Sequence, residues 1–240
     1  MPNRAPLHPP NPIKLLVADD RLVVREGLKH LVAGRRDMKV VGEAATAEEV
    51  LQQAETTRPD VLLLDLFLGG PQILGLTRDM KRRHRQCRVL VLSVQGDDPD
   101  ALRILEAGAA GYLSKDYSPG QLIDAIRQVG RGASYVSPSL AGILIAGLGG
   151  RGKKRPGHAG LSDREYQVLC MFGSGIAFKQ IAAELGLSPK TVSTYRSRIL
   201  DKLKLRGNAD IIRYAIEHSL VPVSPGASPR RRKNPTRHSA

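Results

Sequence analysis

Residues 61–65 read Val-Leu-Leu-Leu-Asp, an apolar run without polar alternation that ends in a carboxylate. Residues 89–94 follow the same pattern as Val-Leu-Val-Leu-Ser-Val. Strands with apolar side chains on both faces are typical of parallel sheets that helices cover from both sides. The two runs therefore predict buried parallel strands, and the first predicts an acidic side chain at the carboxyl end of a strand.

Around these two runs, the rest of residues 12–132 repeats one pattern. Further short apolar runs lie at 13–18, 38–41 and 111–113, and amphipathic helical patterns lie near 21–34, 47–57, 73–84, 99–107 and 119–131. Five successive pairs of strand and helix predict an α/β domain with a five-stranded, doubly wound parallel sheet.

Beyond this domain the sequence changes character. Residues 133–160 contain a glycine-rich, basic stretch and are interpreted as a linker. Residues 161–221 show only helical patterns, near 162–173, 177–185, 189–203 and 208–219, which predicts a four-helix, all-α domain. The proline-rich ends, residues 1–11 and 222–240, are expected to be disordered.

The positive charge of the chain is unevenly distributed. The formal net charge is +14, yet residues 12–132 hold 18 Lys and Arg against 17 Asp and Glu. Residues 133–240 hold 18 against 6, so the helical part is expected to meet a polyanion such as nucleic acid. A basic tail kept for solubility is the alternative.

Membrane insertion and disulfide bonding are not indicated. The longest nearly apolar run, residues 140–150, is about half as long as a membrane span, and no charged and apolar leader opens the chain. Cys87 and Cys170 match neither a metal spacing nor a disulfide framework and are interpreted as core thiols in a reducing compartment. A cytoplasmic protein without membrane contact is expected.

Acidic residues follow two of the predicted strands. Asp19 and Asp20 follow the first, and Asp65 follows the third. Carboxyl ends of parallel strands meet at one edge of the sheet, and three converging carboxylates favour a Mg²⁺ ion. Asp65 is then placed to attack a phosphoryl group and form an aspartyl phosphate, which Ser93 and Lys115 would contact. Taken singly, Asp19 or Asp20 is also explained as a cap of the following helix, Asp65 as a turn residue and Lys115 as a solvated lysine.

Four motifs resemble the receiver domain of two-component response regulators: 18–20 (Ala-Asp-Asp), 63–66 (Leu-Leu-Asp-Leu), 91–93 (Val-Leu-Ser) and 109–116 (Ala-Ala-Gly-Tyr-Leu-Ser-Lys-Asp). The resemblance implies a flavodoxin-like fold and phosphate transfer to Asp65 from a sensor histidine kinase. It also implies Mg²⁺ ligation by the following groups: Asp19, Asp20, Asp65 and the Phe67 backbone carbonyl. Ser93 and Tyr112 would form the switch, with Lys115 at the phosphoryl group. Such a protein is not an enzyme with an external substrate, although it dephosphorylates itself.

The loop after Asp65 departs from this family. Receivers usually have Met-Pro three and four residues after the acceptor and Gly four residues later, whereas residues 66–71 read Leu-Phe-Leu-Gly-Gly-Pro and the next glycine is Gly75. The loop is therefore interpreted as two residues longer. This leaves open an alternative in which the receiver is a docking or dimerisation module and DNA binding is independent of phosphorylation.

A helix-turn-helix pattern lies in the all-α domain. Gly186 ends one helix, and Ser188 with Pro189 is a typical N-cap and first helical position of the next. The spacing of Val192, Ile199 and Leu203 predicts the buried face of that second helix. The opposite face would then carry Lys190, Thr191, Thr194, Ser197 and Arg198, which suit contacts to phosphates and base edges. An ordinary amphipathic surface helix is the alternative.

Residues 161–165, 175–182, 187–192 and 199–203 resemble the LuxR-type DNA-binding domain, so the whole chain resembles a NarL/FixJ-group response regulator. The resemblance implies binding to double-stranded DNA, a homodimer when phosphorylated, contacts through the last helix near 209–215, and RNA polymerase as a further partner. Among the expected DNA contacts, Ser193 stands where the family commonly has Lys, and Tyr195 where it has His. The predicted DNA-binding residues are Lys179, Lys190, Thr191, Ser193, Thr194, Arg196 and Arg198.

A nucleotide-binding enzyme is a third, weaker interpretation. Residues 147–154 satisfy both GxGxxG and GxxxxGK spacing, with Gly147 to Lys153 as the phosphate loop. However, Lys154 stands where Mg²⁺ binding needs Ser or Thr, and Pro156 follows where a helix has to begin.

Overall fold

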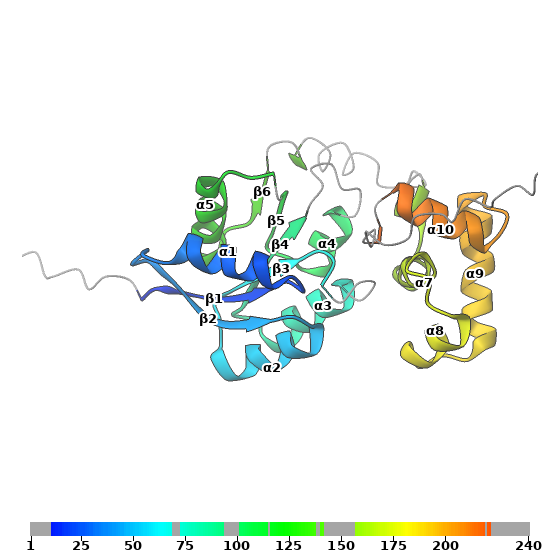
Figure 1. Ribbon diagram of the computed structural model, residues 1–240, viewed down its shortest axis with the longest axis horizontal. Helices are drawn as coiled ribbons and strands as arrows, with labels where there is room; N and C mark the ends of the chain where they lie inside the picture. The colour runs from blue at the N-terminus through cyan, green and yellow to red at the C-terminus, as the bar shows by residue number, and fades with distance from the viewer. Residues whose placement is uncertain are drawn as a thin grey trace, which may run out of the picture.

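The computed structural model describes residues 11–68, 73–93, 101–114, 116–137, 140–141, 157–218 and 220–221. Figure 1 shows an α/β unit followed by a separate helical unit. The strands of the first unit are β1 (Ile13–Ala18), β2 (Met38–Ala44), β3 (Val61–Asp65), β4 (Arg88–Ser93), β5 (Gly111–Ser114) and β6 (Tyr135–Val136). Its helices are α1 (Leu22–Val32), α2 (Ala47–Thr57), α3 (Ile73–Arg83), α4 (Ala101–Ala107) and α5 (Pro119–Gly130).

The strands form one parallel sheet in the order β2-β1-β3-β4-β5-β6. The predicted doubly wound sheet is confirmed, but the predicted strand count of five was wrong. The sixth strand lies in the segment interpreted as a linker, and Tyr135 pairs with Gly111. A Cβ atom at Gly111 would lie 2.8 Å from the Tyr135 carbonyl oxygen, so the glycine permits this close approach. A two-residue strand is too short to show a period in the sequence.

Alternate residues of the central strands enter two separate cores. Leu15 and Val17 of β1 pack with buried residues of α1 and α5, such as Leu28 and Ile126. The opposite side chains, such as Leu16 of β1, pack toward α2, α3 and α4. Figure 1 shows these helices on the two faces of the sheet. Burial on both faces explains why the strands lack polar residues.

The helical unit begins with a 3-10 turn, η2 (Gly157–Gly160), in the segment expected to be a linker, and continues with four helices. These are α7 (Asp163–Gly173), α8 (Phe178–Glu184), α9 (Pro189–Leu203) and α10 (Asn208–Glu217). Val192 and Ile199 are fully buried and Leu203 is half-buried, as the spacing predicted. The Ser188 side chain accepts a hydrogen bond from the Thr191 N–H at 3.1 Å, which confirms the predicted N-cap.

The two units contact each other through the side chains of Arg103 and Arg78, and these contacts are called the tether below. Arg103 of α4 is only 7% exposed, and its guanidinium carbon lies 4.9 Å from the ring centroid of Tyr166 in α7. The same guanidinium donates to the Leu161 carbonyl and lies 3.9 Å from Asp163, which also pairs with Arg78 of α3. In Figure 1, α7 faces the α/β unit and α9 lies on the far side of the helical unit.

Among the described residues, no helix is both long enough and apolar enough to cross a membrane. Cys87 and Cys170 are buried free thiols, as predicted. Burial, with a contribution from the Asp60 charge, raises the pKa of the Cys87 thiol to about 12. Cys87 is therefore an unreactive core residue at neutral pH.

Candidate functional site

Asp19, Asp20 and Asp65 meet at the carboxyl edge of the sheet. Oxygen atoms from the three carboxylates all lie within 4.8 Å of one another. Parallel pairing of Ala18 with Leu64 brings the ends of β1 and β3 together. The residues that follow this pair, Asp19 and Asp65, therefore lie at the same edge of the sheet. Asp19 and Asp65 are each 1% exposed, whereas Asp20 is open to solvent.

Backbone donors hold two of these carboxylates in place. The Arg21 N–H donates to Asp19 Oδ1 at 2.9 Å, and the Phe67 N–H donates to Asp65 Oδ2 at 3.1 Å. The first contact closes a local turn; it does not cap α1, whose N-cap residue is Arg21 and makes no side-chain capping hydrogen bond. Phe67 lies in the turn after β3, two residues beyond Asp65.

This donor set is suited to a hard divalent cation. Mg²⁺ prefers oxygen ligands and keeps several waters, and a cluster of three carboxylates of which one is exposed provides both. Three clustered carboxylates also repel one another unless a cation compensates them. The residues present therefore fit the implied metal ion.

The structure describes two of the residues predicted to act with Asp65, Ser93 and Tyr112, but not the third, Lys115. Ser93 is fully buried at the end of β4, which pairs with β3 at Leu92 opposite Asp65. Tyr112 of β5 is also fully buried. Lys115 and the stretch from Gly69 to residue 72 lie outside the described residues, as do 147–156 with the nucleotide-binding pattern.

A cationic side chain that sequence reasoning missed reaches the acidic cluster. Arg21 Nε lies 3.5 Å from Asp19 Oδ1 and 3.7 Å from Asp20 Oδ1, and Arg21 Nη2 lies 3.9 Å from Asp65 Oδ1. The available signal was its position directly after the Asp19-Asp20 pair. Arg21 therefore belongs to the site although it was not among the predicted residues.

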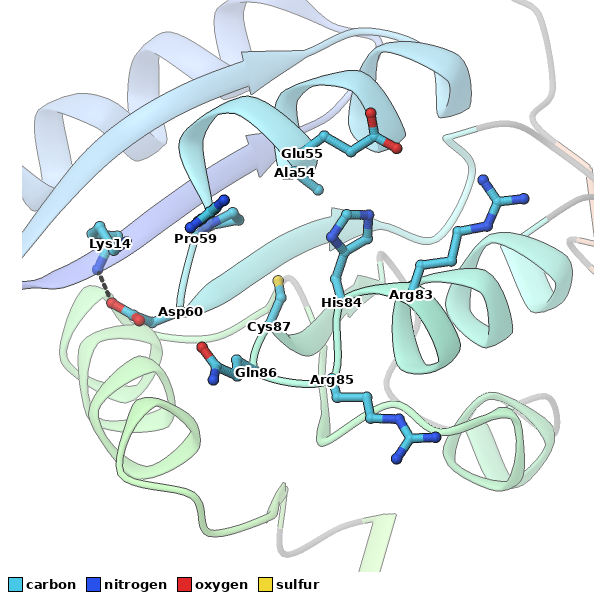
Figure 2. A pocket seen from close by; sticks show the side chains of 11 residues that line it. Lys14, Ala54, Glu55, Pro59, Asp60, Arg83, His84, Arg85, Gln86 and Cys87 are labelled. Atoms are coloured by element: carbon cyan, nitrogen blue, oxygen red, sulfur yellow. Dashed lines mark hydrogen bonds between the residues drawn. The ribbon is translucent and has the colours of Figure 1, made fainter.

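A cavity of about 470 Å³ lies at the opposite, amino-terminal edge of the sheet. Its lining includes Lys14, Asp60 and Cys87, which precede or begin strands β1, β3 and β4. Figure 2 shows the His84 ring and the Cys87 thiol turned toward this space. The cavity is thus separated from Asp65 by the length of the sheet, and it is not part of the acidic site.

The predicted DNA-binding residues lie on α8 and α9. Gly186, with a φ of 62°, forms the turn between these helices, and the arrangement is a helix-turn-helix. Among them, Thr191 and Arg196 are half-buried. The others are exposed: Lys179, Lys190, Ser193, Thr194 and Arg198.

Three of these side chains already have partners within the unit. Thr191 Oγ1 lies 2.8 Å from Ser188 Oγ, and Thr194 Oγ1 donates to the Lys190 carbonyl at 3.0 Å. Arg196 Nε donates to Asn208 Oδ1 at 2.5 Å, which ties α9 to the start of α10. Among the described contacts, none joins the exposed side chains of Lys190, Ser193 and Arg198 to α10. These three are therefore better placed to contact DNA.

A buried histidine packs beside the tether between the units. His158 of η2 is 4% exposed, and its ring centroid lies 5.8 Å from that of Tyr214 and 5.4 Å from that of His218. Burial, followed by the nearby charges of His218 and Arg103, lowers the pKa of His158 from 6.5 to about 4.

This histidine predicts an acid-sensitive helical unit. Between pH 6.5 and 4 the His158 side chain binds a proton in the unfolded chain but not in the folded one. The free energy of unfolding is therefore undiminished by His158 above pH 6.5 and falls by up to about 3 kcal/mol toward pH 4. We expect the melting temperature of the wild type to fall more between pH 7.5 and 5 than that of His158→Asn. Equal falls in calorimetry would contradict this assignment.

Two family models match the two units of this chain. The family model described as the response regulator receiver domain matches residues 15–127, and that of the bacterial regulatory proteins of the luxR family matches residues 159–215. The chain belongs to the NarL/FixJ-type response regulators of two-component systems, which are DNA-binding transcriptional regulators and not conventional enzymes.

Individual relatives cover nearly the whole chain. The response regulator UvrY of Escherichia coli (strain K12) is 34% identical over 208 residues, which are 87% of this chain and 95% of UvrY. The response regulator GacA of Pseudomonas syringae pv. syringae (strain B728a) is 37% identical over 213 residues, 88% of this chain and 99% of GacA.

A solved structure shares the arrangement of the fold. RcsB from Salmonella enterica serovar Typhimurium, bound to promoter rprA in the presence of phosphomimetic BeF₃⁻, has a TM-score of 0.65 and 24% identity to this chain. The match covers 84% of this chain and 98% of RcsB. At this identity the likeness concerns the fold alone.

Proposed function

We propose that the protein is switched by phosphorylation of Asp65 and then regulates transcription as a DNA-bound dimer. The buried carboxylate of Asp65, clustered with Asp19 and Asp20 at the sheet edge, is the observation that carries this proposal. The donor would be a phosphohistidine of a sensor histidine kinase. A carboxylate oxygen of Asp65 forms the new P–O bond while the P–N bond of the donor breaks.

The metal-binding residues in this proposal are Asp19, Asp20, Asp65 and the Phe67 carbonyl. A bound Mg²⁺ supplies positive charge that neutralises the phosphoryl oxygens. Ser93 and Lys115 would donate to those oxygens, and Ser93 and Tyr112 would relay the change to the α4 and β5 surface. Hydrolysis of the aspartyl phosphate by the protein itself returns it to the resting state.

The DNA-binding part of the proposal rests on charge and exposure. The exposed face of α9 carries Lys190 and Arg198, and Lys179 is exposed on α8. Basic side chains around a helix start suit phosphate contacts, while Ser193 suits a base edge. Two such units in a dimer would read half-sites about 10 bp apart. The tether through Arg103 leaves α9 on the far side of the helical unit, so activation would act by pairing the units.

We assign the receiver to residues 12–132 and the DNA-binding domain to 161–221, with tails at 1–11 and 222–240. The segment 133–160 lies between them and contributes β6 to the sheet and η2 to the helical unit. The proposed location is the cytoplasm, where a sensor kinase, double-stranded DNA and RNA polymerase are all accessible.

Sedimentation velocity tests this function directly. We expect wild type to shift from monomer toward dimer when Mg²⁺ and beryllofluoride, a phosphoryl mimic, are added together. Either component alone should leave the distribution unchanged. Absence of a shift would reject the phosphorylation switch and favour the docking-module interpretation.

Lys190→Ala tests the recognition surface. Each phosphate contact contributes about one unit to the slope of log affinity against log salt. We therefore expect Lys190→Ala to weaken binding to all duplexes and to lower the slope by about one unit, measured by fluorescence anisotropy. Lys39→Ala, an exposed lysine on β2, is the matched control and should leave the slope unchanged. An unaltered slope for Lys190→Ala would remove it from the DNA surface.

A further inference from the structure

Arg21 folds its side chain back over the acidic cluster. It is the N-cap residue of α1, with an extended backbone at φ −93° and ψ 114°, and follows directly after Asp20. Its Nε atom lies 3.5 Å from Asp19 Oδ1 and 3.7 Å from Asp20 Oδ1, and its Nη2 atom lies 3.9 Å from Asp65 Oδ1. A single guanidinium thus forms ion pairs with all three carboxylates.

This position has an electrostatic cause. Two of the three carboxylates are 1% exposed and the cluster spans no more than 4.8 Å, so the mutual repulsion of the charges needs a compensating cation. The Arg21 side chain is 53% exposed and its distances are those of ion pairs rather than of short hydrogen bonds. It therefore compensates the cluster while remaining able to swing into solvent.

A divalent metal ion and this guanidinium compete for the same oxygens. Mg²⁺ needs its oxygen ligands at about 2.0–2.1 Å in octahedral geometry. A guanidinium within 4 Å of the same oxygens occupies the approach to them and repels a divalent cation. Binding of Mg²⁺ therefore includes the cost of displacing Arg21.

We propose that Arg21 is the resident counter-cation of the receiver and sets its Mg²⁺ affinity by competition. This inference rests on the proposed phosphorylation function, which needs Mg²⁺ at the same cluster. Arg21 acts as a positioning residue: it keeps the three carboxylates together in the metal-free protein and leaves when the metal binds. Asp19 and Asp65 have further interactions besides Arg21, so the cluster does not depend on it for folding.

The neutral variant Arg21→Gln separates competition from support. If Arg21 competes, its removal tightens Mg²⁺ binding by about two- to fivefold, the range that half-exposed ion pairs permit. If Arg21 instead only supported the carboxylates, its removal would weaken binding. Arg21→Lys keeps the charge and should bind Mg²⁺ with an affinity close to wild type.

Isothermal titration calorimetry of the full chain with MgCl₂ at constant ionic strength measures this, since the protein has no tryptophan to report binding. The control is Arg36→Gln, which removes the same charge from an exposed residue beside the start of β2, at the other edge of the sheet. It should change the affinity by less than twofold. Equal or weaker Mg²⁺ binding by Arg21→Gln would overturn the inference.

Two results distinguish failure of this inference from failure of the proposed function. Wild type that binds Mg²⁺ and dimerises with beryllofluoride, together with an Arg21→Gln variant of unchanged affinity, overturns only the role of Arg21. Absence of Mg²⁺ binding in both proteins overturns the metal-dependent function as well. As a second measurement, the rise in melting temperature on adding Mg²⁺ should be larger in Arg21→Gln than in wild type.

Discussion

Asp65→Asn is expected to abolish phosphorylation and to leave the protein monomeric when Mg²⁺ and beryllofluoride are added. Asn has the shape of Asp but lacks the anionic oxygen that forms the bond to phosphorus, so phosphate incorporation should fall at least about a thousandfold. The side chain is 1% exposed, and an isosteric replacement keeps its packing. Loss of one carboxylate should also weaken Mg²⁺ binding.

The measurement is sedimentation velocity of both proteins, combined with phosphate transfer from a kinase or a small phosphodonor. Asp124→Asn on α5 is the control, because that carboxylate is 75% exposed and, within the part of the chain that the structure describes, its ion pair is with Arg127 at 3.4 Å in the same helix. It should behave as wild type. A dimer of Asp65→Asn that forms with beryllofluoride would show that the acceptor is another residue.

Glu165→Ala is expected to destabilise the DNA-binding unit by about 3 kcal/mol, because it breaks a buried ion pair and a helix cap together. Glu165 is 2% exposed, and its carboxylate accepts from Lys202 Nζ at 2.7 Å and from the Ser162 N–H at 2.7 Å. These contacts join the start of α7 to the end of α9. Lys202 is about half-exposed and can return to water, so the loss stays at the lower end for buried pairs.

The loss is best seen in urea unfolding followed by circular dichroism, with Arg164→Ala as the control. Arg164 is the exposed neighbour in α7 and should change stability by less than about 0.5 kcal/mol. Burial alone would raise the pKa of Glu165, but its hydrogen bonds with Lys202 and Ser162 outweigh burial and lower it. The contribution of Glu165 is therefore present above its ordinary pKa near 4.5 and is lost in acid. Similar urea midpoints for Glu165→Ala and wild type would contradict this role.

Local patterns in the sequence predicted the order of the helices and of the five longer strands in the two units. Continuous apolar runs such as 61–65 predicted buried parallel strands, because covering helices leave a strand no polar face. Ser188-Pro189 predicted the start of α9 at the correct residue, because an N-cap and a first-turn proline act within a few residues. The two-residue strand β6 was missed, since its pairing depends on Gly111 far away in the chain.

The acidic residues of the candidate site were also predictable from the sequence, but their contacts with other side chains were not. Asp19, Asp20 and Asp65 follow strands whose carboxyl ends share one edge, so their meeting follows from the fold class. Arg21 was not predictable as a partner, because an arginine after a strand turns to solvent as readily as to a carboxylate. The sequence predicted only that Arg103 belongs to an amphipathic helix, and no neighbouring residue indicated its contact with Tyr166.

The sequence by itself therefore determined which helices and strands form, the doubly wound topology, and the residues gathered at the sheet edge. Hydrophobic period and helix capping follow from residues a few positions apart, and strand order follows from the fold class, so none of them depends on a particular distant side chain. Only the tertiary structure decided the ion pairs of Arg21 with three carboxylates, the link from Glu165 to Lys202, and the contact of Arg103 with α7. These depend on side-chain positions in space, which residue spacing along the chain does not specify.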